Sequence, residues 1–222
     1  MAIACSLIMF LALMLALVGH EYIHALTGYL MGDETAKRMG RLTLNPLAHA
    51  DLVGTILLPL VCILSGAPVI GWAKPVPFNP YNLRNQKWGP VVVALSGPFS
   101  NFGMALVFLL GLKMALAAGL TPFNLLAIFF TDLVVINVVL GLFNFIPVPP
   151  LDGSKILIAL LDHPKYRRLL FFLETRGPLI LMVILVLDLF SPVPILGLIF
   201  GGAVNFVFSA AGLHNMLQAV RC

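Results

Sequence analysis

The long apolar stretches of this 222-residue chain constrain its fold more than any other feature. About 20 consecutive apolar residues are enough to cross the hydrocarbon core of a bilayer as a helix. Charged residues make up only 10% of the chain, whereas a soluble domain carries about 25%. We therefore expect an all-α polytopic membrane protein with about five to six transmembrane helices. The apolar stretches cover residues 2–30, 52–70, 91–118, 123–146 and 179–213, the last broken at Ser191-Pro192-Val193-Pro194.

The basic residues predict how the chain is oriented. They follow the first two apolar stretches and recur after the fourth, whereas the turn at 118–122 has none. Cytoplasmic loops carry an excess of Lys and Arg, so we expect all three basic clusters to be cytoplasmic. Loop clusters of this kind meet anionic lipid, and the net charge of +4 therefore does not predict a nucleic-acid partner.

The segment at about 51–70 is predicted to be re-entrant or broken. A single spanning helix there would put the basic clusters on its two sides in opposite compartments. Two glycines and two prolines within the segment favour the same interpretation. Irregular backbone is tolerated at membrane depth only where protein shields it or where it lines a wet cavity. The alternative is a full span.

Two histidines and a glutamate stand near the end of the first apolar stretch, in the sequence His20-Glu21-Tyr22-Ile23-His24. On a helix His20 and His24 are one turn apart, so their imidazoles can converge on one metal ion. Glu21 lies beside them and can take a proton from a metal-activated water. Ionisable side chains cost free energy in hydrocarbon, which makes a functional role the default hypothesis. The spacing is that of zinc hydrolases.

A catalytic zinc usually has three protein ligands and one open position for water. The candidate for the third ligand is Asp152, which follows a segment with three prolines that exclude a regular helix. We expect this segment, 144–153, to be extended or unwound, with unpaired backbone groups that can pair with an extended substrate. If 51–70 re-enters, Asp152 lies on the same side as the two histidines. The alternative role for Asp152 is to cap a helix that starts near Ser154.

Several other polar residues receive more modest interpretations. His49 and Asp51 precede the re-entrant segment and are expected to cap it, with a gate or a role beside the metal as the alternative. Asn101 and Asn137 lie in apolar helices, where interhelical hydrogen bonding is favoured over direct catalysis. The neighbouring Gly97-Pro98 pair predicts a close helix approach or a kink beside the site.

Together these residues resemble the site-2 metalloproteases, zinc enzymes that cut substrates within the membrane. The resemblance is to the compact bacterial or archaeal branch without a PDZ or CBS domain. It covers about residues 20–157, and the last sixty or so residues match nothing diagnostic. The matching pieces are the His20–His24 motif, the segment 144–153 read as NxxPxPxLDG, Asn45–Asp51 with Gly54-Thr55, Gly71–Pro80 and Ser96–Asn101.

The resemblance implies a role for each residue of the site. His20, His24 and Asp152 would bind one Zn²⁺ per chain, and Glu21 would activate the water. The substrate-binding residues would be Asn144, Pro147 and Pro149.

The even spread of the apolar stretches favours a single integral-membrane metalloprotease domain over 1–222, with a catalytic core at about 1–160 and C-terminal helices at about 165–222. The basic clusters place the active site of this multi-pass protein of the cell membrane near the cytoplasmic side. The resemblance implies a transmembrane protein as substrate. The sequence makes no prediction of oligomeric state.

Two rival functions come from different classes. A zinc-binding but non-proteolytic membrane regulator would leave Glu21 without a purpose. A metal transporter would need polar ligands along a path through several helices, whereas 179–213 offers only Asp188 and Asn205 as notable polar groups.

Overall fold

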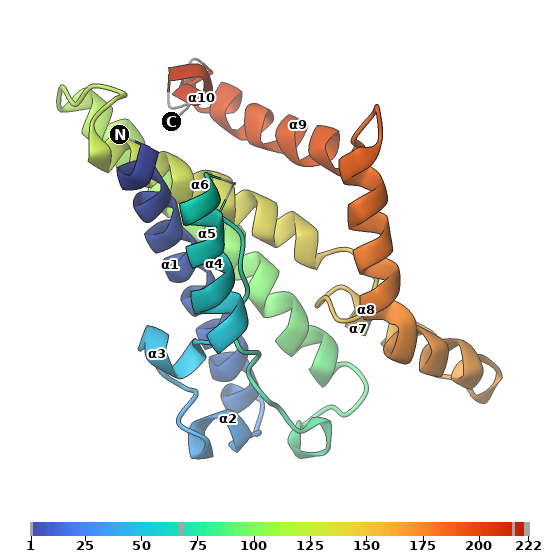
Figure 1. Cartoon of the computed structure of the whole chain (residues 1–222). Helices are drawn as coiled ribbons and strands as arrows, with labels where there is room; N and C mark the ends of the chain where they lie inside the picture. The colour runs from blue at the N-terminus through green and yellow to red at the C-terminus, as the bar shows by residue number, and fades with distance from the viewer. Residues whose placement is uncertain (1, 67–68, 215, 220–222) are drawn as a thin grey trace.

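The structure is a computed structural model that describes residues 2–66, 69–214 and 216–219, and its regular elements in that part of the chain are all helical (Figure 1). Within these residues, four helices are long and apolar enough to cross a membrane. They are Ile3–Leu30, Gly89–Ala117, Leu125–Asn144 and Pro164–Phe190, and two shorter apolar helical segments are Leu52–Ser65 and Ile195–Ala210. The expected all-α polytopic fold is confirmed.

Helices α1 (Ala2–Leu30), α5 (Gly89–Ala117) and α6 (Leu125–Asn144) pack side by side as a three-helix bundle (Figure 1). In hydrocarbon every backbone N–H and C=O must be paired within its own segment, which favours helix throughout these apolar stretches. The side chain of Asn124 caps α6 by accepting a hydrogen bond from the Leu126 N–H at 2.9 Å. The helix ends ahead of the proline-rich segment, because proline cannot continue it.

The segment predicted to be re-entrant or broken is broken, and its described residues belong to a hairpin, in which the chain turns back on itself. A π-helical turn, η1 (Leu52–Leu57), runs into α4 (Leu58–Ser65). These two elements together rise about 21 Å, which is less than the hydrocarbon core of about 30 Å. The chain then returns, because the Trp72 N–H donates to Gly54 O at 3.1 Å. A Cβ at Gly54 would lie 2.3 Å from the Trp72 ring, so this return requires glycine.

The C-terminal helices stand apart from the site end of the bundle. A short α7 (Ser154–Leu160) and a 3-10 turn, η3 (Pro164–Tyr166), lead into α8 (Arg167–Phe190), which leans away from α5 and α6 (Figure 1). The chain breaks between α8 and α9 (Ile195–Ala210), as the Ser191–Pro194 sequence predicts. Phe208 of α9 is fully buried against α5 and α6 and anchors this return to the bundle.

Asp33 ties the end of α1 to the loop that enters α5. Its Oδ1 accepts hydrogen bonds from the Thr35 N–H, the Thr35 Oγ1 and the Asn82 Nδ2 at 3.1, 2.5 and 2.9 Å, and its Oδ2 accepts one from the Asn79 N–H at 2.6 Å. Burial disfavours ionisation of Asp33, but these hydrogen bonds outweigh burial and lower the pKa of its carboxyl. The carboxylate therefore stabilises the fold above its unfolded-state pKa, and this stability is lost as the pH falls through the folded-state pKa.

Asp33→Asn is expected to lower the stability of the protein at pH 7. The amide places a donor against the donors that now meet the carboxylate, at a cost of about 1–3 kcal/mol. The thermal unfolding midpoint in detergent, measured against the wild type, should fall at pH 7 and fall by less as the pH is lowered through the folded-state pKa, where the wild-type carboxylate becomes protonated. Asp162→Asn, in an exposed loop, is the control. A fall that does not change with pH would contradict this role.

Candidate metalloprotease active site

Helix α1 places His20 and His24 one turn apart on the face that meets α5. Their Nε2 atoms are 2.9 Å apart, and Asp152 Oδ2 lies 3.1 Å from His20 Nε2 and 3.3 Å from His24 Nε2. The turn that follows α6 thus brings the third candidate ligand to the first two. Within the described residues, this is the one group of three such side chains that could hold a metal ion.

The hydrogen bonds of the two imidazoles fix which ring nitrogen carries the hydrogen. His24 Nδ1 donates to Val93 O at 2.7 Å, since a carbonyl can only accept. His20 Nδ1 lies 2.6 Å from Asn101 Oδ1, which also accepts. Both Nε2 lone pairs therefore point toward Asp152 Oδ2, a buried oxygen that makes no hydrogen bond in the described structure. Three lone pairs that face one another repel unless a cation lies between them.

The three side chains fit zinc. Zn²⁺ binds imidazole nitrogen and carboxylate oxygen at about 2.0–2.2 Å in tetrahedral geometry, so its ligand atoms lie about 3.3 Å apart. The observed separations of 2.9, 3.1 and 3.3 Å are close to that value. Burial disfavours ionisation of Asp152, but the two imidazoles beside it outweigh burial and lower the pKa of its carboxyl to about 2. Asp152 is therefore ionised at neutral pH, as a metal ligand must be.

A compact turn between α6 and α7 carries Asp152. The Gly153 N–H donates to Asn144 O at 2.7 Å, which closes the segment on itself. A Cβ at Gly153 would lie 2.3 Å from Phe145 O, so this closure requires glycine. The segment is unwound, as expected, but it turns back rather than extending. Helix α7 begins at Ser154 without a side-chain cap, so Asp152 does not have the capping role considered as its alternative.

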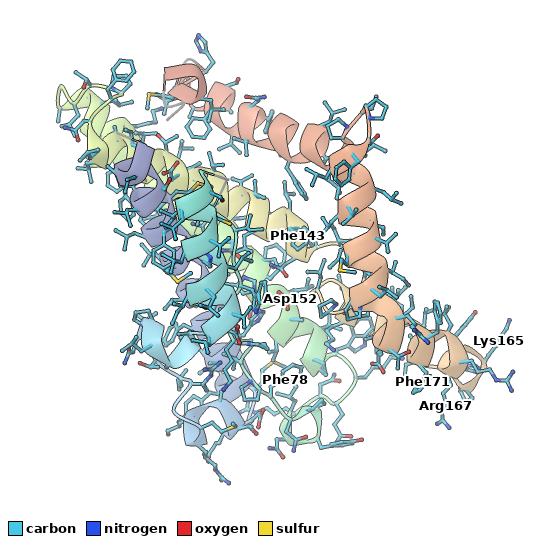
Figure 2. The ribbon with its side chains drawn as sticks, in the orientation of Figure 1. Phe78, Phe143, Asp152, Lys165, Arg167 and Phe171 are labelled. Atoms are coloured by element: carbon cyan, nitrogen blue, oxygen red, sulfur yellow. The ribbon has the colours of Figure 1, made fainter. Side chains whose placement is uncertain are left out.

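A cavity of about 450 Å³ opens beside the three candidate ligand atoms, and Glu21 lines it. Glu21 Oε2 accepts a hydrogen bond from the Val76 N–H at 2.8 Å, which holds the carboxylate in place. Figure 2 shows Asp152 between Phe143 and Phe78, two aromatic side chains that also line the cavity. The cavity is thus bounded by apolar walls and contains a glutamate next to the candidate metal ligands.

The substrate-binding candidates are only partly brought to the cavity. Asn144 lines it, and its Nδ2 donates to Leu140 O at 3.0 Å, which leaves one amide hydrogen for another acceptor. Pro147 and Pro149 are not among the lining residues. Pro147 is exposed, and Pro149 is buried against Gly177 of α8.

The two polar residues before the hairpin of η1 and α4 lie outside the candidate ligand group. Asp51 caps η1, because its Oδ1 accepts hydrogen bonds from the Val53 and Gly54 N–H groups at 3.0 and 2.7 Å. This confirms the capping interpretation for Asp51. His49 is buried and its Nε2 donates to Thr43 O at 2.8 Å.

Three contributors to the site were not predicted in these roles. The Val76 backbone N–H holds Glu21, and no pattern in the sequence signals a backbone donor. Lys155 lines the cavity. Its position three residues after Asp152 could have indicated that it lies near the site. Gly97 was expected to permit a close helix approach, and what approaches it is the imidazole pair: a Cβ there would lie 2.4 Å from His24 Nε2 and 2.6 Å from His20 Cε1.

Comparisons with known proteins show the family to which the chain belongs. The family model of peptidase family M50 matches residues 112–187. The chain is 36% identical over 188 residues to YwhC of Bacillus subtilis (strain 168), which covers 82% of this chain and 81% of YwhC. It is 30% identical over 208 residues to Rip2 of Mycolicibacterium smegmatis (strain ATCC 700084 / mc(2)155), which covers 92% of this chain and 74% of Rip2. Both relatives are named as zinc metalloproteases. No solved structure matches.

The apolar helices and these relatives define the class of the protein, which is a multi-pass membrane metalloprotease. More narrowly, the chain belongs to peptidase family M50, the site-2 protease family, in agreement with the resemblance read from its motifs.

Proposed function

We propose that this protein is a zinc-dependent intramembrane endopeptidase that cleaves membrane-embedded protein segments. The observation that supports it most is the convergence of His20 Nε2, His24 Nε2 and Asp152 Oδ2 to within 3.3 Å of one another. They converge beside a cavity, and the two histidines lie on a helix long enough to cross a membrane. These three residues are the proposed ligands of one zinc ion per chain, and Glu21 is the proposed base. The proposed domain is the whole of 1–222.

The proposed chemistry assigns proton transfer to Glu21. When bound, zinc would polarise the scissile carbonyl and lower the pKa of the attacking water. Glu21 takes a proton from that water and delivers it to the leaving amine nitrogen. Asn144 donates its remaining amide hydrogen to the oxyanion, a contribution of about 2.7–4 kcal/mol in comparable sites. Pro147 and Pro149 shape the turn that holds the substrate strand.

An extended substrate strand is proposed to pair with segment 69–79. A substrate helix must unwind at the scissile bond, since its carbonyls are otherwise hydrogen-bonded. The N–H groups of Trp72, Lys74 and Val76 all donate into the protein, to Gly54 O, His49 O and Glu21 Oε2. Ala73, between Trp72 and Lys74, lines the cavity and makes no backbone hydrogen bond within the described residues. Its N–H and C=O can therefore pair with a substrate backbone, as in strand addition.

The proposed location is the cell membrane, with the active site near the cytoplasmic side. Lys37 and Arg38 lie in α2 (Thr35–Arg38), just beyond the end of α1 that carries the histidines. Lys165 and Arg167 point away from the bundle in Figure 2. Basic residues at this end support a cytoplasmic position. Labelling of Lys87→Cys and Thr121→Cys variants from either side of sealed vesicles tests it, and the proposal fails if position 121 is the cytoplasmic one.

Cleavage in liposomes tests the proposed function. The purified protein is reconstituted with two single-span substrates that differ only in a Gly-Pro pair or a Leu-Leu pair at mid-membrane. We expect cleavage of the Gly-Pro substrate to be at least about tenfold faster, because its helix unwinds more easily. A chelator should stop cleavage and added zinc should restore it. Bound zinc without cleavage of either substrate would favour a regulator, and zinc uptake into the vesicles would favour a transporter.

A further inference from the structure

Two fully buried asparagines connect the three helices of the bundle behind His20. Asn101 of α5 and Asn137 of α6 are both 0% exposed. His20 Nδ1 lies 2.6 Å from Asn101 Oδ1, Asn101 Nδ2 donates to Asn137 Oδ1 at 2.8 Å, and Asn137 Nδ2 donates to Leu133 O at 2.8 Å. This chain of hydrogen bonds, the asparagine relay, runs from the α6 backbone to a candidate metal ligand on α1.

The Leu133 carbonyl determines which group donates at each hydrogen bond of the asparagine relay. The Leu133 carbonyl can only accept, so Asn137 must turn its NH₂ toward it and its oxygen toward Asn101. Asn101 must then donate to Asn137 and present its own oxygen to His20. It follows that His20 carries its hydrogen on Nδ1 and keeps the lone pair of Nε2. Each step depends on the one before it.

We propose that Asn101 and Asn137 are positioning residues that fix the tautomer and ring orientation of His20, and that they thereby set the zinc affinity of the site. This inference rests on one part of the proposed function, namely that His20 is a zinc ligand. Neither asparagine is part of the ligand group. Histidine ligands commonly donate their second ring N–H to a nearby acceptor, and loss of that acceptor weakens metal binding.

The other histidine offers an internal contrast. His24 Nδ1 donates directly to the Val93 backbone carbonyl, which no side-chain substitution removes. His20 instead depends on an amide, which can present either its oxygen or its NH₂. Without Asn137, the Asn101 amide is free to flip. A flipped Asn101 would favour a hydrogen on Nε2 of His20, and that tautomer cannot bind zinc.

Zinc affinity tests the asparagine relay, measured on purified protein in detergent by competition with a chelator of known affinity. Asn101→Leu should weaken zinc binding about 10- to 100-fold. Asn101→Asp should bind zinc more tightly than Asn101→Leu, because a carboxylate accepts from His20 in either orientation, although it can no longer donate to Asn137 Oδ1. Asn137→Leu should weaken binding about tenfold in the wild type. It should not weaken binding in the Asn101→Asp background, where residue 101 has no amide that can flip. A merely structural role would not produce this difference.

The matched control is Thr131→Val. Thr131 is buried on α6, and its Oγ1 donates to Ala127 O at 2.8 Å, the same one-turn bond to its own helix that Asn137 makes. This variant should bind zinc as the wild type does. The proposal is overturned if Asn101→Leu retains wild-type affinity, or if Asn137→Leu weakens binding equally in both backgrounds. A wild-type protein that binds no zinc would instead refute the proposed function itself.

Discussion

Replacing Glu21 with glutamine is expected to abolish proteolysis while zinc stays bound. The glutamine oxygen can still accept the Val76 N–H that Glu21 accepts at 2.8 Å, so the site keeps its shape. A neutral amide cannot take a proton from water, and loss of a general base lowers rates by about 10²–10⁴-fold. Cleavage of the Gly-Pro substrate in liposomes and zinc content per chain, measured on the same preparation, check both parts.

The matched control for Glu21 is Glu174→Gln, an exposed position on α8. It removes the same charge outside the cavity, and the rate should stay at the wild-type value. If Glu21→Gln cleaves as fast as Glu174→Gln, then Glu21 is not the base. If Glu21→Gln loses zinc together with activity, its role is in metal binding or folding instead.

Gly97→Ala is expected to remove both zinc and activity, although Gly97 offers no ligand. A Cβ at this position would lie 2.4 Å from His24 Nε2 and 2.6 Å from His20 Cε1. Either α5 moves away or the imidazoles turn, and both movements break the hydrogen bonds to Val93 and Asn101 that orient the rings. Because two proposed ligands are disturbed together, zinc affinity should fall at least about 100-fold.

Helix α5 contains its own control in Gly103→Ala, since a Cβ there has no neighbour within 4 Å. Both substitutions add the same methyl group to the same helix and raise its helix propensity alike. Zinc competition on the two variants separates the local clash from a general effect on α5. Equal affinities would show that the approach of α5 to the histidines does not matter for the metal.

The parts of the fold that follow from short-range patterns could be predicted from the sequence. The apolar stretches predicted the spanning helices, because backbone N–H and C=O groups in hydrocarbon must be hydrogen-bonded within the protein. The charge on either side of 51–70 predicted a re-entrant or broken element, and the contact of Trp72 with Gly54 shows that the chain is broken there and turns back. Helical periodicity alone predicts that His20 and His24 share a face, and the need of a metal for a third ligand led to Asp152, which the structure places beside them.

Other features depend on contacts between segments that are distant in sequence. The hydrogen bond from the Val76 N–H to Glu21 joins a backbone group to a side chain of α1. Every residue except proline has a backbone N–H, so the residue type at position 76 does not predict this bond. Asn101 and Asn137 were expected to bridge helices, but their connection to His20 requires knowing which faces of α1, α5 and α6 meet. Pro147 and Pro149 were predicted to bind substrate, but neither lines the cavity. Because 144–153 folds back on itself, Pro149 packs against α8 instead.

X-ray absorption at the zinc edge, together with metal analysis of the purified protein, tests the central claim most directly. We predict one zinc per chain with two imidazole nitrogens and carboxylate or water oxygens at about 2.0–2.2 Å, and no sulfur. Asp152→Ala should lose one oxygen ligand and bind zinc more weakly, while Glu21→Gln should leave the spectrum unchanged. A sulfur shell at about 2.3 Å, or a spectrum unaffected by Asp152→Ala, would contradict the His20, His24 and Asp152 site.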